Sequence, residues 1–169
     1  MCTKKDVIAA GFFLNYINKA ADTDVLKSIR LNTKAFHKLL KDIPAKKRKH
    51  AYAEGKWTIK ESLQHIIDAE RVFACRALRT ARQDATPMPG FDENNWAIAA
   101  NKTNRKWNGL VKEFTTVRAS TEMFFEDLGK EELLFEGMAS NQPINALALG
   151  YIIAGHAQHH IDIIKERYL

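Results

Sequence analysis

Three of the six histidines in the chain lie in the short stretch GHAQHH, residues 155–160. If this stretch is helical, His156 and His160 are one turn apart and share a face with apolar residues that should point into a helical bundle. Two imidazoles at this i, i+4 spacing can bind one metal ion. His159 is a rival ligand, although it lies towards the flank of the apolar face. The alternative is a set of hydrogen-bonded core histidines.

His65, in the sequence SLQHIIDAER, is the candidate for a third ligand. Helical spacing places it at the border between an apolar and a charged face, which suits the wall of a cleft and equally suits a plain surface histidine. Three neutral imidazoles would form a site for zinc, nickel or another divalent metal, with positions left open for water or substrate. Cys75 lies ten residues further on, about 15 Å along the helix, which is too far for a fourth ligand.

A three-histidine metal with open positions supports two kinds of chemistry. It can lower the pKa of a bound water and so supply a hydroxide for hydrolysis. It can equally lower the pKa of a bound thiol and so supply a thiolate for transfer to an electrophile. The catalytic group would be the metal-bound water or thiolate, and the residues themselves leave both chemistries open.

Two carboxylates near His65 are further candidates. Glu70 falls inside the apolar face of its predicted helix, where a carboxylate needs a partner, and Arg118 is a suitable one. A structural ion pair is favoured over catalysis for Glu70, because buried pairs commonly produce such positions. Asp68, three residues after His65, either orients a ligand from behind or is simply solvated.

Three more side chains fall near the predicted site. Arg167 shares the face of the last helix with the two histidines, where it would meet either an anionic substrate group or a carboxylate at the end of the bundle. Trp57 and Trp96 either close over the cleft or pack in the core, and core packing is the default for tryptophan.

The elements that must position these residues are helical. Four long segments carry a helical period and no run of alternating strand residues stands out. A capping box, TIKE, begins the second segment at Thr58, and Ser140 or Asn141 is expected to cap the last one, with Pro143 in its first turn. The sequence therefore predicts an all-α four-helix bundle in a single domain, residues 1–169. The four long helices are expected at about 24–42, 58–82, 104–128 and 144–168. A short helix is expected at about 7–20, and a helical turn before the third long helix.

Composition excludes some function classes. The net charge is +6 and the pI about 9.3, but the one basic run, KKRKH at 46–50, lacks aromatic or groove-reading partners, so nucleic-acid binding is not expected. No segment approaches the roughly 20 apolar residues of a membrane span. The N-terminal segment lacks a small-residue cleavage site, so no signal peptide is expected. Two isolated cysteines favour a reducing, cytoplasmic setting.

The stretch from Gly55 to Glu93, GKWTIKESLQHIIDAERVFACRALRTARQDATPMPGFDE, and the C-terminal ALGYIIAGHAQHHIDIIKERYL resemble the DinB/YfiT-like superfamily. The GKW, HxxDxER, RALRxAR, PMPGF and GHxxHH elements occur in the family's order and spacing. The nearest resemblance is to the YfiT-like branch, whose members are described as metal-dependent hydrolases and as bacillithiol S-transferases.

The resemblance implies a four-helix bundle in which His65, His156 and His160 bind nickel or zinc, with His159 as a neighbour that is not normally a ligand. It also implies a homodimer and a small-molecule substrate. A bacillithiol-type S-transferase using an anionic thiol is the leading interpretation; a metal-dependent hydrolase and a non-catalytic metal-binding or interaction bundle are the alternatives. Cys75 and Trp96 stand where relatives often carry tyrosine, which leaves the substrate preference open.

Overall fold

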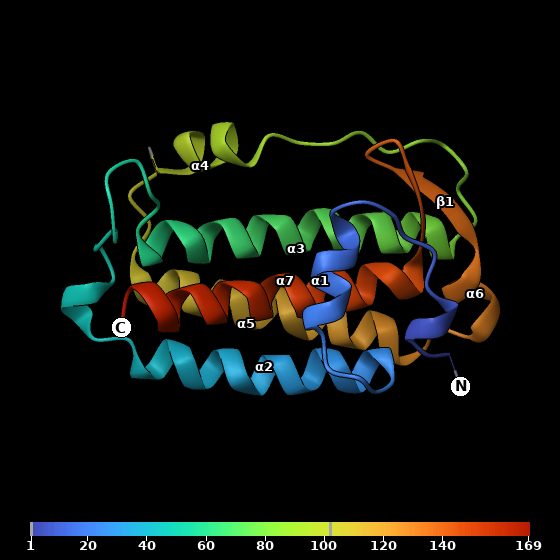
Figure 1. Ribbon diagram of the computed structural model, residues 1–169, viewed down its shortest axis with the longest axis horizontal. Coiled ribbons are helices and arrows are strands. Elements are labelled where there is room, and N and C mark those ends of the chain that lie inside the picture. The colour runs from blue at the N-terminus through green and yellow to red at the C-terminus, as the bar shows by residue number, and fades with distance from the viewer. Residues whose placement is uncertain (1, 102) are drawn as a thin grey trace.

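The computed structural model describes residues 2–101 and 103–169, and its four longest helices form a bundle (Figure 1). These four helices are α2 (Val25–Asp42), α3 (Ile59–Ala81), α5 (Trp107–Glu126) and α7 (Ala146–Arg167). The predicted all-α four-helix bundle is confirmed. The shorter helical elements are η1 (Lys4–Asp6), α1 (Phe13–Lys19), η2 (Ala45–Lys47), α4 (Glu93–Asn101) and α6 (Lys130–Leu134). None of the helices in these described ranges is long and apolar enough to cross a membrane.

The start of α3 follows the predicted capping box. The backbone N–H of Glu61 donates to Thr58 Oγ1 (3.2 Å), and the N–H of Thr58 donates back to Glu61 Oε2 (2.6 Å). Two of the otherwise unpaired N–H groups at the helix end are thereby satisfied. This cap fixes where α3 begins and so fixes which of its residues, His65 among them, face α7.

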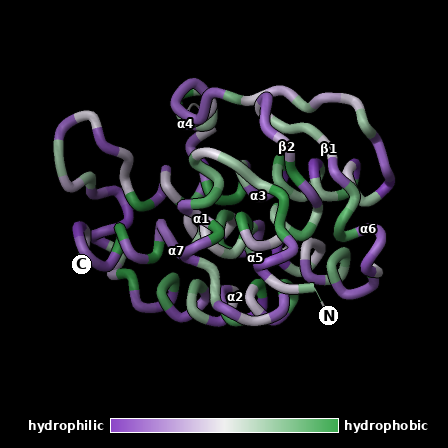
Figure 2. Tube along the Cα trace, turned by 45° about the vertical axis from the view of Figure 1, so that its right-hand side comes forward, coloured by the Kyte–Doolittle hydropathy of each residue, from purple (hydrophilic) through white to green (hydrophobic). Residues whose placement is uncertain are grey.

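Helix α7 lies at the centre of the molecule, packed against α1, α2 and α3 (Figure 1). Every residue from Ala146 to Ala157 is buried, as expected of a helix that is apolar on all sides. In Figure 2 the hydrophobic residues gather where α1, α3 and α7 meet. Gly155 allows the closest of these contacts, because a Cβ at this position would lie 1.8 Å from the backbone oxygen of Tyr16 in α1.

The structure corrects the expected start of the last helix. Residues 136–145 form a β-hairpin of β1 (Glu136–Ala139) and β2 (Gln142–Asn145), although no strands were expected. Ser140 and Asn141 both have positive φ, 52° and 60°, which is the signature of a type I′ turn. These two residues therefore turn the hairpin, and Asn145 is the cap of α7, accepting a hydrogen bond from the N–H of Ala148 (2.8 Å).

Other boundaries differ less. The short N-terminal helix is confined to Phe13–Lys19, the third long helix begins at Trp107, and the predicted helical turn before it is α4. Helix α6 was not predicted. The loop after α3 pairs with the hairpin: the N–H of Met88 donates to the carbonyl of Met138, and the N–H of Ser140 donates to the carbonyl of Met88, both at 2.9 Å. This pairing holds the loop over the outer face of α3.

Candidate metal centre

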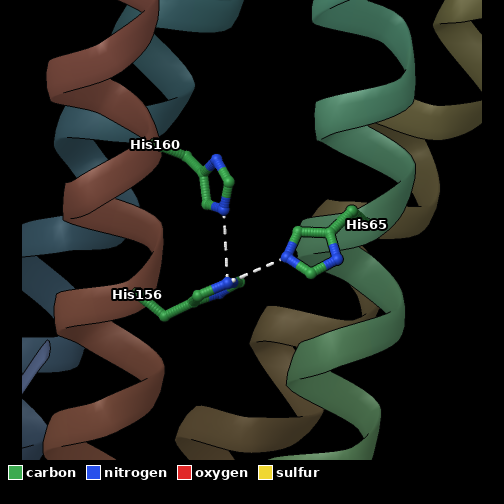
Figure 3. A group of neighbouring side chains, drawn as sticks. All are labelled: His65, His156 and His160. Carbon is green, nitrogen blue, oxygen red and sulfur yellow. Dashed lines mark hydrogen bonds between the residues drawn. The ribbon is translucent and has the colours of Figure 1, made fainter. Parts of the chain in front are cut away.

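His65 on α3 and His156 and His160 on α7 point their rings toward one another across the gap between the two helices (Figure 3). The Nε2 atom of His156 lies 3.0 Å from Nε2 of His65 and 3.2 Å from Nε2 of His160. One ring nitrogen from each of the three lies within 4.8 Å of the others. The structure thus brings together all three residues that the sequence singled out as ligand candidates.

Hydrogen bonding alone does not satisfy this arrangement. Each ring nitrogen has a single in-plane position, which holds either a proton or a lone pair. His156 Nε2 cannot bond to both neighbours at once, because it can donate to one or accept from one. A cation between the rings would use all three lone pairs together. Metal–nitrogen bonds of about 2.0–2.1 Å place neighbouring ligand nitrogens roughly 2.9–3.4 Å apart in tetrahedral or octahedral coordination, so the two observed separations fit a metal.

Burial keeps these imidazoles neutral, as metal ligands must be. Burial lowers the pKa of His65 to about 4 and that of His160 to about 3. Burial also holds the pKa of His156 well below its usual value, and the neighbouring rings of His160 and His65 lower it further. At neutral pH the ring nitrogens therefore present lone pairs rather than positive charge.

Aromatic side chains hold two of the three rings in place. The indole of Trp57 packs against His65, with ring centroids 4.7 Å apart. Tyr16 from α1 and Phe73 from α3 contact the ring of His156 edge-on, with ring centroids 5.1 and 5.7 Å from that of His156. Packing of this kind fixes the ring orientations before any ligand binds.

The three histidines line one cavity of about 550 Å³, a size suited to a small organic molecule. Its wall is mostly aromatic and apolar, with a few polar side chains. The lining residues besides the three histidines are Phe12, Phe13, Tyr16, Trp57, Ala69, Phe73, Arg76, Gly90, Phe91, Glu93, Ser140 and His159. The cavity beside the three histidines therefore has room for a molecule larger than water.

His159 and Asp68 are placed differently. His159 lines the cavity beside His160, with ring centroids 5.3 Å apart, but it is outside the group of three converging nitrogens. Asp68 does not line the cavity; it accepts a hydrogen bond from Gln64 (2.9 Å) and lies 3.9 Å from Arg71. Of the two, only His159 lines the cavity that holds the three histidines.

Glu70 forms the predicted buried ion pair with Arg118. Arg118 Nε donates to both carboxylate oxygens of Glu70, at 2.8 and 3.0 Å, and Nη2 adds a third bond at 2.8 Å. Thr121 donates to the same carboxylate, and Asn32 accepts from Arg118. Neither charged residue lines the cavity, so Glu70 is a structural residue here.

Arg167, Trp96 and Cys75 also lie outside the cavity. Arg167 donates to the hydroxyl of Tyr52 (3.2 Å) near the C-terminal end of the bundle. Trp96 and Cys75 line a separate surface hollow on the outer side of α3. Trp57 is the one of the two tryptophans that closes on the histidines.

Several lining residues were missed by sequence reasoning. Tyr16 lies on a short helix whose packing partner is not evident from the sequence, and Ser140 was expected to be a helix cap. Arg76 could have been found, because it is eleven residues after His65. Eleven residues at about 100° each make three turns plus roughly 20°, so both side chains share one face of α3.

The DinB superfamily profile matches residues 28–164. The chain belongs to the DinB superfamily. This DinB chain is similar to an Oceanobacillus iheyensis protein named "Putative metal-dependent hydrolase OB0413", with 26% identity over 142 residues, covering 83% of this chain and 81% of the relative. It is also similar in fold to YfiT from Bacillus subtilis, with a TM-score of 0.71 at 14% identity, covering 98% of this chain and 87% of YfiT. That structure is described as "a probable metal-dependent hydrolase with an unusual four-helix bundle topology".

Proposed function

We propose that this protein is a metal-dependent enzyme in which His65, His156 and His160 bind one divalent metal ion. The observation that carries the proposal is the convergence of three neutral ring nitrogens, which hydrogen bonds alone do not satisfy, on the wall of a cavity of about 550 Å³. The names of the two similar proteins, both of which refer to metal-dependent hydrolysis, support it.

The chain's own residues bind the metal and shape the space around it. Three imidazole donors suit zinc or nickel, and three protein ligands leave positions for a small-molecule substrate. When bound, such a metal supplies a Lewis acid that lowers the pKa of a water or thiol. Trp57 packs against His65 and Phe73 against His156, and His159 lies beside His160 in the cavity wall.

Hydrolysis is the first candidate reaction, because both similar proteins carry that description. Transfer of a low-molecular-weight thiol to an electrophile is the second, and the motifs shared with the YfiT-like branch favour it. The aromatic wall of the cavity would suit the apolar part of either kind of substrate. The homodimer stays a prediction.

One experiment separates the two reactions. Protein loaded with zinc or nickel is offered an ester or amide panel without thiol, and separately a thiol with the electrophile monochlorobimane. Turnover of the panel would identify a hydrolase, and metal-dependent thioether formation would identify a transferase. Either activity should be lost in His65→Ala and kept in His50→Ala, which removes an exposed histidine outside the cavity. Activity that survives His65→Ala and metal removal would contradict the proposal.

A further inference from the structure

Arg76 is a buried cation without a counter-charge. Its side chain is on α3, the residue is 4% exposed, and no carboxylate of the described residues lies within ion-pair distance of it. Its Nη2 donates to the carbonyl oxygen of Pro89 (2.6 Å) and to Ser140 Oγ (3.2 Å). A guanidinium has five N–H donors, so Nε and Nη1 together keep three donors without a partner in the part of the chain that the structure describes.

The other buried arginine shows what a satisfied guanidinium looks like in this fold. Arg118 donates to Glu70 from two nitrogens and to Asn32 from the third. Its ion pair is closed and lies away from the cavity. Arg76 has no such partner among the described residues, and burying a charge without one is costly. The hydrogen bonds of Arg76 to Pro89 and Ser140 both come from Nη2, so they satisfy only one of its three side-chain nitrogens.

The open nitrogens of Arg76 are accessible rather than sealed in the core. The buried polar side-chain atoms that lack a partner among the described residues are Ser28 Oγ and Arg48 Nε, and no atom of Arg76 is among them. Arg76 lines the same cavity as the three histidines. Burial lowers the pKa of Arg76, as expected of a cation that has lost water without gaining an anion.

The cavity has two polar ends with an apolar stretch between them. His65, Ala69, Phe73 and Arg76 follow one another along one face of α3 and all line it. The Cα atoms of His65 and Arg76 are about 16 Å apart along the helix axis, so the two residues lie at separate parts of the cavity wall. Ser140 stands beside the guanidinium, and its hydroxyl hydrogen is free to donate because its oxygen accepts from Arg76.

We propose that Arg76 and Ser140 form an oxyanion subsite, so that the substrate of this cavity carries a carboxylate or phosphate at the end remote from the three histidines. The planar guanidinium fork matches two oxygens of either group, and Ser140 adds a hydroxyl donor. Phe73 and Phe91 would contact the apolar part of the molecule between its two ends. This assignment names a substrate class for the proposed enzyme and in that respect rests on the proposed function.

Arg76 lies between two hollows, and the residues around it favour the histidine cavity as the place where the anion binds. Arg76 also borders the neighbouring hollow that contains Cys75 and Arg79, but Ser140 lines only the histidine cavity. Glu93, the one carboxylate among the described residues of the cavity wall, acts at the other end, where its charge raises the pKa of Tyr16 after the larger effect of burial. No acidic side chain of the described residues opposes an anion beside Arg76.

The test compares matched ligands on the metal-free protein, titrated by NMR in the presence of a chelator. The probes are 3-phenylpropionate, its neutral amide 3-phenylpropionamide, and 2-phenylethyl phosphate. Wild-type protein should bind at least one of the two anions about tenfold or more tightly than the amide, since hydrogen bonds to a charged group carry this much discrimination. The tighter anion identifies the head group. Equal binding of both anions and the amide to the wild type would overturn the proposal without any variant.

Variants place the anion. Arg76→Met should reduce the anion preference to about twofold or less, and Arg76→Lys, which keeps the charge, should retain part of it. Arg79→Met is the control, because Arg79 lines only the neighbouring hollow and pairs with Asp84. A preference lost in Arg79→Met and kept in Arg76→Met would contradict the assignment. Because the metal is absent throughout, a failed subsite leaves the three-histidine site untouched, and a failed metal site leaves the anion preference intact.

Discussion

His65 and His156 are 91 positions apart in the sequence, yet their Nε2 atoms lie 3.0 Å apart in the fold. The contact joins α3 to α7, and His160 adds a third nitrogen one turn further along α7. The position of the three nitrogens therefore depends on how α3 packs against α7. The stability of the protein should therefore respond to pH, to a change in helix packing and to the loss of a buried charge.

Metal-free protein should lose stability as the pH falls from 6.5 toward 4. Burial lowers the pKa of His65 from 6.5 to about 4, so the unfolded chain binds a proton in this range that the folded chain does not. This contribution to the free energy of unfolding is fully present above pH 6.5 and declines below it. His156 and His160, whose pKa values burial also lowers from 6.5, add to the decline, and His160, with a pKa of about 3, extends it to lower pH. Urea unfolding with a chelator at several pH values measures this. His65→Gln should make the decline shallower, since His156 and His160 still titrate, and His50→Ala should leave it as in the wild type. Superimposable profiles for wild type and His65→Gln would count against the burial argument.

Gly155→Ala should destabilise the protein strongly. The added Cβ would lie 1.8 Å from the backbone oxygen of Tyr16, so α1 must move away from α7, at a cost on the order of 1–3 kcal/mol. Gly109→Ala is the matched control, because a Cβ on this residue of α5 meets nothing within 4 Å. Chemical denaturation compares the two variants. A Gly155→Ala protein as stable as Gly109→Ala would show that α1 does not pack as described.

Arg118→Met should be more damaging than the loss of a surface ion pair. It leaves the carboxylate of Glu70 buried without its cation, which costs about 3–5 kcal/mol in comparable cases. Arg30→Met, which removes an exposed partner of Glu126, should have a much smaller effect. Thermal unfolding of both variants provides the comparison. The folded fraction of Arg118→Met should still bind one metal ion per chain, since neither Arg118 nor Glu70 lines the cavity.

Helical periodicity predicted most of the bundle and the ligand candidates, because spacing along a helix decides which side chains share a face. The Glu70–Arg118 pair was predicted for a related reason: a carboxylate within an apolar face needs a partner. The hairpin was missed because each strand has only four residues, too few for alternation to stand out. The spacing of Arg76 from His65 places both on one face of α3, but spacing alone does not distinguish an arginine that pairs with a carboxylate from one that faces a cavity.

Metal content tests the central claim most directly. Untagged protein loaded with zinc or nickel and then dialysed should retain about one ion per chain by elemental analysis, because three imidazoles converge on one point. His156→Ala and His160→Ala should each lose it, and His50→Ala should retain it. If the wild type retains no divalent metal under any loading condition, or if His156→Ala retains as much as the wild type, the three histidines are not a metal site.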